Sequence, residues 1–460
     1  MMPRKLTIWQ KLKLVKRPKN GSITNPYYGC TVGAAYSVLG IKGGVPIANC
    51  GPGCMYKQFF MQSFDNGFQG SYGAGGGNLP SANVQENDVV FGGLKTLDNL
   101  IKSSLAVIKG DLYVVLTGCS GELIGDDVPS VVKKYRDKGY PIVCADTGGF
   151  KGTNLTGHEI VVQSIIDQFV GDYDGEKTPG LVNLWFETPY YNQNWRGDYE
   201  EIVRILRGAG LKVNILFGPE NEGVKAWKKI PKAQFNLIIS SWVGLETVEK
   251  LKEKYNQPYL HIPVLPIGEE ATSAFVRKVV EYAGIDKKKS EKFIKREAEL
   301  YYYYIEHFAE FFSEYWFGLP SEFAVIANSD YAIAYTKFLA DQIGLIPKKT
   351  IVTDNPPEKY RAALAEEYKH LSDGVAIEPD FVEDGYTVQQ ILEKEVTFGP
   401  GVPLIIGTTW EIDYARDHGA LLLESSSPTT ESLVVNKSYI GYKGALSFIE
   451  HIYSATVGGK

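Results

Sequence analysis

The chain of 460 residues contains little cysteine, histidine or methionine, and its five cysteines are placed unevenly. No cysteine follows Cys144, so the remainder of the chain offers neither a sulfur nucleophile nor a thiolate ligand. Cysteine thiolates are the preferred ligands of soft metal centres. A chain that keeps all of its thiols in its first third is therefore arranged to hold one metal centre there.

Other absences exclude whole classes of function. A net charge of −6 is small for this length and does not indicate nucleic acid or an anionic membrane as a partner. No apolar run approaches the roughly 20 residues that a membrane helix needs, and none follows the basic start, which we interpret as a solvated arm. An odd number of irregularly spaced cysteines does not suit a secreted disulfide framework. We expect a cytoplasmic protein.

Familiar catalytic motifs are also missing. The sequence has no G-x-x-x-x-G-K-[ST] loop, so any ATP hydrolysis that the function needs belongs to another protein. It has no G-x-S-x-G elbow, and its six histidines lack metal-ligand spacing such as H-E-x-x-H. The glycines of 73–77 do not follow a strand and predict a surface loop. The adjacent Asp126 and Asp127 are interpreted as a helix cap rather than an acid–base pair.

From residue 111 onward, short β-branched runs alternate with helical stretches, which is typical of parallel sheets. Three sets of strands predict an α/β fold of three Rossmann-like, doubly wound domains, over residues 1–175, 176–290 and 291–460. A long helix at about 287–317 is expected between the second set and the third. The predicted strands are 112–116 and 141–144, then 181–185, 212–217, 236–239 and 261–265, and finally 323–326, 350–352, 374–377 and 403–406.

Three cysteines, Cys30, Cys54 and Cys119, each lie on a glycine-rich turn beside an apolar segment. Cys119 follows the predicted strand 112–116, at the carboxyl edge where open parallel sheets bind ligands. Helix N-termini and glycine N–H groups favour the thiolate over the thiol, and iron–sulfur clusters require thiolates in such surroundings. A single cysteine at such a turn is more often a small buried hydrophobe. The turns alone leave both interpretations open.

Several segments resemble the characteristic blocks of the nitrogenase component 1 family. These are 25–30, 49–54, 83–93 and 117–127, and the segment 441–446 is similar to the closing Gly-Tyr/Phe-x-Gly block of the family. The resemblance covers nearly the whole chain and implies three Rossmann-like domains. The family includes the two nitrogenase subunits, the scaffold pair that assembles the nitrogenase cofactor, and nitrogenase-like reductases.

The resemblance also implies a site. Cys30, Cys54 and Cys119 match the three cysteines that each nitrogenase subunit contributes to the P-cluster at the subunit interface. Three thiolates leave a four-iron cluster one ligand short, so a partner chain or an unusual ligand must complete it. Cys50 and Cys144 are additional to the family pattern. Either could be a fourth ligand or a small buried thiol.

Departures from the family narrow the function. The nitrogenase α chain anchors its active-site cofactor through a middle-domain cysteine and a third-domain histidine, but the matching segments here, 236–242 and 423–430, have neither residue. The second of these segments, 423–430, looks closer to a β-type subunit. Gly148 and Gly149 replace a serine that β chains use at the P-cluster, which favours a simpler [4Fe–4S] centre. His158 is a candidate to tune the cluster from a second layer of contacts.

Our leading hypothesis is a β-type subunit of a nitrogenase-like reductase, and hence an oxidoreductase subunit. It would share a P-cluster-like or [4Fe–4S] cluster with an α-type partner in an α2β2 assembly. Electrons would come from a separate ATP-hydrolysing iron protein and pass to a cofactor in the partner. The alternative is a scaffold subunit for assembling a nitrogenase-type cofactor. A third possibility is a Rossmann-like regulatory subunit with vestigial cysteines. The sequence does not identify the substrate.

Overall fold

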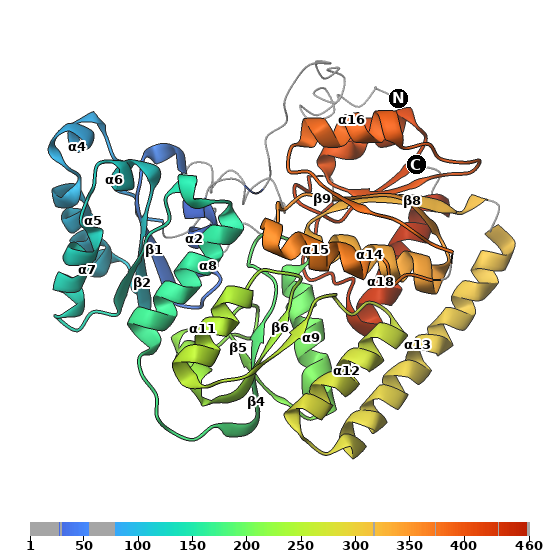
Figure 1. Cartoon of the computed structure of the whole chain (residues 1–460), viewed down its shortest axis with the longest axis horizontal. Helices are drawn as coiled ribbons and strands as arrows, with labels where there is room; N and C mark the ends of the chain where they lie inside the picture. The colour runs from blue at the N-terminus through green and yellow to red at the C-terminus, as the bar shows by residue number, and fades with distance from the viewer. Residues whose placement is uncertain are drawn as a thin grey trace, which may run out of the picture.

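A computed structural model describes residues 27, 30–54, 79–315, 318–372, 374–430 and 432–457. The described part of the chain forms three units, each built on its own sheet, and every strand pairing is parallel. Figure 1 shows the N-terminal unit beside the other two, which lie one above the other in that view. The predicted α/β fold with parallel sheets is therefore confirmed.

The N-terminal unit has a sheet in the order β1-β2-β3. Every residue of β2 is buried, and its side chains alternate between two cores, as expected for a sheet covered on both faces. Helices α2 and α8 cover one face, and α5 and α7 cover the other. The elements are β1 (Gly44–Asn49), β2 (Leu112–Thr117), β3 (Ile142–Ala145), α2 (Cys30–Leu39), α4 (Glu86–Phe91), α5 (Leu94–Val107), α6 (Cys119–Leu123), α7 (Val128–Arg136) and α8 (Asn154–Ile165).

The strands β1 and β2 pair in a register that brings their ends to the same level. Asn49 lies opposite Thr117, and the Gly118 N–H donates to the Asn49 carbonyl at 2.9 Å. The segments that carry Cys50 and Cys119 therefore leave the sheet side by side. Asp127 caps α7 by accepting a hydrogen bond from the Ser130 N–H at 3.2 Å, which confirms the capping interpretation.

The middle unit has a four-stranded sheet in the order β5-β4-β6-β7. A buried amide network, formed by Asn183, Asn214, Asn236 and Gln257, joins neighbouring strands inside this unit. Because each of these polar side chains is paired, the network can be buried at modest cost. The elements are β4 (Thr178–Trp185), β5 (Lys212–Ile215), β6 (Ala233–Ile239), β7 (Tyr259–Ile262), α9 (Trp195–Ala209), α10 (Val224–Lys229), α11 (Leu245–Tyr255) and α12 (Glu269–Ala283).

The C-terminal unit has a five-stranded sheet in the order β10-β9-β8-β11-β12. Its central strands β8 and β11 are almost wholly buried. The elements are β8 (Glu322–Ala327), β9 (Ile346–Val352), β10 (Pro379–Phe381), β11 (Leu404–Gly407), β12 (Leu421–Glu424), α14 (Ser329–Lys337), α15 (Glu358–Glu367), α16 (Gly385–Glu395), α17 (Ile412–Asp417) and α18 (Gly441–Val457).

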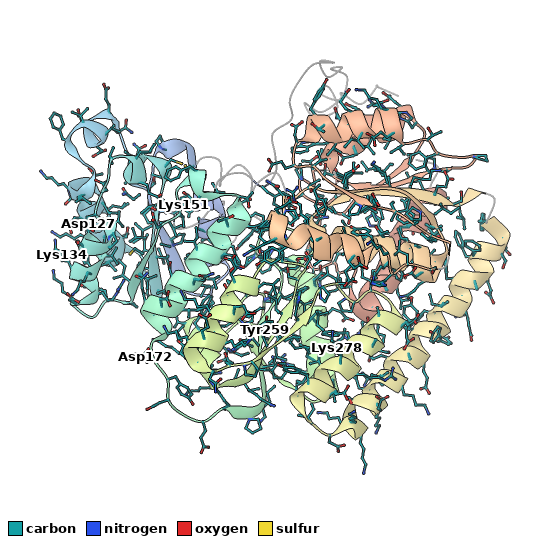
Figure 2. The ribbon with its side chains drawn as sticks, viewed as in Figure 1. Asp127, Lys134, Lys151, Asp172, Tyr259 and Lys278 are labelled. Atoms are coloured by element: carbon teal, nitrogen blue, oxygen red, sulfur yellow. The ribbon has the colours of Figure 1, made fainter. Side chains whose placement is uncertain are left out.

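The long predicted helix is present as α13 (Lys287–Tyr315), which runs along the outer edge from the middle unit to the C-terminal unit (Figure 1). It packs against α9, α12 and α18, and buries Phe293, Ile294 and Tyr301. Tyr302, Tyr303 and Tyr304 are exposed. The helix spans the predicted boundary at 290/291, and the boundaries stay predictions. Figure 2 shows side chains within all three units, with Lys151 in the N-terminal unit and Tyr259 in the middle unit.

One strand prediction needs correction, and two strands were not predicted. Residues 374–377 do not form a strand, and the edge strand β10 lies at Pro379–Phe381 instead. Strands β1 and β12 were not expected, because β1 contains Gly44 and Pro46, which disfavour strands, and β12 is only four residues long. The basic start, the apolar segment after Cys54 and the glycine loop at 73–77 lie outside the described residues.

Candidate iron–sulfur site

The candidate site lies at the carboxyl edge of the N-terminal sheet, where the chain leaves β1 and β2. Cys50 follows β1 directly and is completely buried, whereas Cys54 and Cys119 are partly exposed. A Cβ atom added to Gly118 would lie 2.3 Å from the Cβ of Cys50. Only glycine therefore allows the turn before Cys119 to rest directly on Cys50.

The thiols of this edge interact with one another. Cys54 packs against Cys50, and the turn that carries Cys119 rests on Cys50 through Gly118. A hydrogen bond with Cys54, together with burial, raises the pKa of the Cys50 thiol. Without a metal, Cys50 is therefore a protonated thiol, and a bound metal would have to replace its proton.

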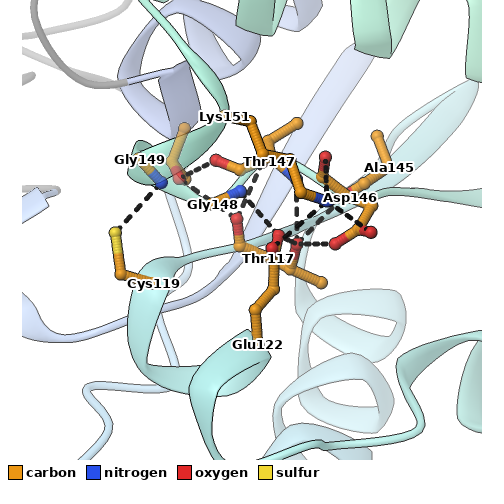
Figure 3. Close-up of polar contacts among 10 residues, drawn as sticks. Thr117, Cys119, Glu122, Ala145, Asp146, Thr147, Gly148, Gly149 and Lys151 are labelled. Carbon is orange, nitrogen blue, oxygen red and sulfur yellow. Dashed lines mark hydrogen bonds and ion pairs between the residues drawn. The ribbon is translucent and has the colours of Figure 1, made fainter.

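Cys119 accepts a hydrogen bond from the backbone. The Gly149 N–H, at the start of the short helical turn η2 (Gly149–Lys151), donates to Cys119 Sγ at 3.0 Å (Figure 3). N–H donors to cysteine sulfur are among the contacts that set the potential of an iron–sulfur cluster. Gly149 is one of the two glycines that the family resemblance singled out, and here its backbone N–H contacts the sulfur.

A polar network holds this loop in place. Glu122 Oε1 accepts hydrogen bonds from Thr117 Oγ1 at 2.5 Å and from the Gly148 N–H at 2.6 Å, and Lys151 forms ion pairs with Glu122 and Asp146 (Figure 3). Burial and a hydrogen bond with Asp146 raise the pKa of Glu122, and the same hydrogen bond lowers the pKa of Asp146. No role was predicted for Glu122 from the sequence, although it lies one helical turn after Cys119.

Two of the three predicted ligands, Cys54 and Cys119, have side chains in the described part of the chain. Cys54 and Cys119 lie at the same edge. Cys30 begins α2, and its side chain is outside the described part, but its neighbour Thr31 has Oγ1 within hydrogen-bond distance of the carbonyls of Thr117 (3.1 Å) and Thr147 (2.6 Å). The start of α2 therefore lies against the loops that follow β2 and β3.

Cys144 belongs to a different environment. Its thiol packs in the core beneath α5 and α7, and Sγ lies 3.7 Å from Gln168 Oε1. Burial raises the pKa of this thiol. Gln168 also bonds the Cys144 backbone, accepting from its N–H at 3.1 Å and donating to its carbonyl at 2.7 Å. These contacts are those of a structural thiol.

The sulfur donors of this edge are of the kind that iron–sulfur clusters use. Within the described ranges, no three His, Cys, Asp or Glu side chains are grouped to hold one metal ion. A cubane cluster instead takes one thiolate at each of four separated irons. Soft sulfur donors from different loops, with an N–H directed at one sulfur, match that requirement. Cys54 and Cys119 would hold such a cluster.

His158 and Glu159 serve the packing of α8. His158 is buried, with Nδ1 2.8 Å from Ser37 Oγ and its ring against Phe217, and burial lowers its pKa to about 3. Glu159 accepts hydrogen bonds from the Gly244 N–H and from Thr247 Oγ1 of the middle unit. None of these contacts involves a cysteine, so a tuning role for His158 gains no support.

The middle-unit segment 236–242, which has no cysteine, forms hydrogen bonds with two acidic side chains of the C-terminal unit. Ser240 and Ser241 follow β6, and the Ser241 N–H and Oγ both donate to Asp330 Oδ1 at 2.5 Å. Trp242 Nε1 donates to Asp354 Oδ2 at 2.9 Å. Burial raises the pKa of Asp330, and raises that of Asp354 to about 6. Neither acid was predicted, since the only signal of each was its position just after a predicted strand.

The fold defines the class of protein. The chain superposes on a solved structure titled "Nitrogenase Cp1 at pH 6.5" with a TM-score of 0.76, over 97% of this chain and 96% of that chain, at 20% identity. A second solved structure, "Nitrogenase Cp1 at pH 5", gives a TM-score of 0.71. The molecule therefore has the three-unit α/β fold of these nitrogenase structures.

Sequence relatives then give the family. The profile described as Nitrogenase component 1 type Oxidoreductase matches residues 30–456. The chain is 25% identical to the nitrogenase molybdenum-iron protein beta chain of Methanococcus maripaludis, with 96% of each covered, and 23% identical to the nitrogenase iron-iron protein beta chain of Rhodobacter capsulatus, with 88% of each covered. It is 22% identical to a chain of the light-independent protochlorophyllide reductase of Angiopteris evecta, over 78% of this chain and 70% of that one. The chain belongs to the nitrogenase component 1 family of oxidoreductases, as a β-type subunit.

The length and apolar character of the helices can be compared with those of a membrane-spanning helix. Across the described residues, none of them combines the length and the apolar character required to cross a bilayer.

Proposed function

We propose that this β-type chain holds an iron–sulfur cluster through Cys30, Cys54 and Cys119, at a surface covered by an α-type partner. A bound cluster supplies one-electron transfer, from a separate ATP-hydrolysing iron protein to a cofactor in the partner. The observation that carries the proposal is that the loops of Cys54 and Cys119 both lie against Cys50 at one sheet edge, with the Gly149 N–H on Cys119 Sγ.

The residues of this chain have definable roles in that function. Cys54 and Cys119 donate thiolates, and the Gly149 N–H stabilises negative charge on Cys119 sulfur. Glu122 and Lys151 hold the loop that presents this N–H. In the segment where an α chain has its cofactor cysteine, Ser241 instead donates a hydrogen bond to Asp330. This supports placing the substrate chemistry in the partner.

The test is anaerobic purification of the chain with its copurifying partner, followed by iron and sulfide analysis and electron paramagnetic resonance of the reduced protein. We expect the wild type to contain iron and Cys119→Ala to lose most of its cluster signal. Cys144→Ala is the matched control and should keep the signal, because its thiol contacts Gln168 instead. A metal-free wild-type complex, or an unchanged signal in Cys119→Ala, would refute the proposal.

An assembly scaffold is the second candidate. It is favoured by the partial exposure of Cys54 and Cys119, since a scaffold must release what it carries. Turnover separates the two functions. With its iron protein and ATP, a reductase complex should consume electrons while keeping its iron, whereas a scaffold should transfer iron to an acceptor protein. Loss of iron to the acceptor, without substrate reduction, would reject the reductase.

A further inference from the structure

Cys50 is additional to the family's three cysteines, yet the structure places it among them. It is completely buried, Cys54 packs against it, and Gly118, the residue before Cys119, lies against its Cβ. Cys144, the other additional cysteine, contacts Gln168 in a separate core. The two extra thiols, which the sequence could not distinguish, therefore have different surroundings.

The environment of Cys50 is enclosed on several sides. Gly118 lies against its Cβ, and the Val84 N–H donates to its carbonyl at 3.1 Å. Ser81 pairs with the end of β1 through Ala48. The Cys50 side chain is thus shielded from solvent and packed against Cys54.

A second observation at the same place points to a ligand. Asn49, the residue before Cys50, is completely buried, and neither polar atom of its side chain has a hydrogen-bond partner among the described residues. Its Nδ2 lies beneath the turn that carries Cys119, 2.7 Å from where a Cβ on Gly121 would be. Buried amides that lack partners are costly, and a sulfide-rich group between these loops would give this amide an acceptor.

We propose that Cys50 is a fourth thiolate ligand, so that Cys30, Cys50, Cys54 and Cys119 of this one chain form a complete ligand set for a [4Fe–4S] cluster. This inference rests on the proposed function, which supplies the other three ligands. The Cys50 Sγ–H bond breaks as the iron–sulfur bond forms, the proton passes to solvent, and no oxidation state changes. The partner would then cover the cluster without having to ligate it.

The experiment uses the full chain expressed without a partner and loaded anaerobically with ferrous iron and sulfide. We expect about four irons per chain for the wild type and for the control Cys144→Ala. Cys50→Ala should lose at least half of the iron or show the signal of a three-iron cluster. Cys50→Ser, which keeps a weaker ligand atom, should recover iron with an altered resonance spectrum.

The possible results separate the loss of a ligand from misfolding and from failure of the proposed function. The thermal unfolding midpoint of each metal-free variant is compared with that of the metal-free wild type. Equal midpoints show that the loss of iron is not caused by misfolding. Cys50→Ala that folds, keeps about four irons and has an unchanged spectrum overturns the role of Cys50. A Cys50–Cys54 disulfide that persists in the iron-loaded wild type also overturns it. Full iron in Cys119→Ala would instead defeat the proposed function itself, so the two failures are distinguishable.

Discussion

Among single residues, Gly149 has the most direct effect on the candidate site, because its N–H donates to Cys119 Sγ. A Cβ at this position would lie 2.9 Å from that sulfur, so Gly149→Ala must push the sulfur away from its donor. We expect the reduction potential of the loaded protein to fall by about 40 mV, the equivalent of about 1 kcal/mol for one electron. A redox titration followed by electron paramagnetic resonance measures this change.

The control for this substitution is Gly53→Ala. Gly53 is next to Cys54, but an added Cβ there meets no atom within 4 Å. We expect the reduction potential of Gly53→Ala to equal that of the wild type. Equal potentials for Gly149→Ala and the wild type would show that the N–H at 3.0 Å does not influence the sulfur.

Residue types predicted part of this site and could not predict the rest. Cys54 and Cys119 were recognisable because they stand on glycine-rich turns. Glu122, Lys151 and Thr31 were not, because their roles depend on loops that follow different strands and meet only in the folded chain. Cys50 and Cys144 looked equivalent in sequence, and only the packing of their side chains separates them.

At the scale of elements, the contact between β6 and α14 joins the middle and C-terminal units. Asp330 on α14 accepts hydrogen bonds from Ser240 and Ser241. Asp330→Ala would leave these buried donors without an acceptor and should lower the free energy of unfolding by about 2–3 kcal/mol. Asp330→Asn keeps one acceptor oxygen and should lose less. Urea unfolding measures both.

Asp341 provides the matched control. It accepts hydrogen bonds from the Ser372 N–H and Oγ at 2.7 and 2.8 Å, but it is exposed, so water can replace the lost acceptor. Asp341→Ala should cost about 1 kcal/mol or less. If Asp330→Ala unfolds at the same urea concentration as Asp341→Ala, the contact between the units does not contribute as argued.

Element prediction succeeded where hydrophobic runs were long. The buried strands β2 and β8 and the long helix α13 were expected nearly at their observed bounds. Strand β1 was not, because proline and glycine disfavour strands locally and only pairing with β2 stabilises it. That missing strand is the one that positions Cys50, which explains why the two extra thiols could not be ranked from the residues alone.

For the whole molecule, His158 links stability to pH. Its pKa is about 3 in the folded chain because it is buried, against an ordinary value near 6.5 when unfolded. Between these values the unfolded chain binds more protons, so acidification through this window destabilises the fold by about 1.4 kcal/mol per pH unit. Stability from His158 is complete above pH 6.5 and is lost as pH falls.

A variant isolates this effect from opposing ones. Burial raises the pKa of Asp198 to about 7 and that of Asp354 to about 6, so these acids contribute stability that is lost as pH rises toward those values. The difference between the wild type and His158→Gln cancels them. We expect the stability advantage of the wild type, measured by urea unfolding without metal, to shrink from pH 6.5 to pH 4. An advantage that is constant over this range would contradict the assignment.

The register of β1 against β2 has a consequence for how this protein can evolve. Since Asn49 lies opposite Thr117, gaining or losing a single residue within either strand would displace one sulfur-bearing loop by about 3.3 Å relative to the other and turn its side chains to the opposite face. Substitutions can accumulate throughout these strands, but length changes cannot. The distance between the two sulfur-bearing loops therefore depends on keeping the lengths of β1 and β2 unchanged.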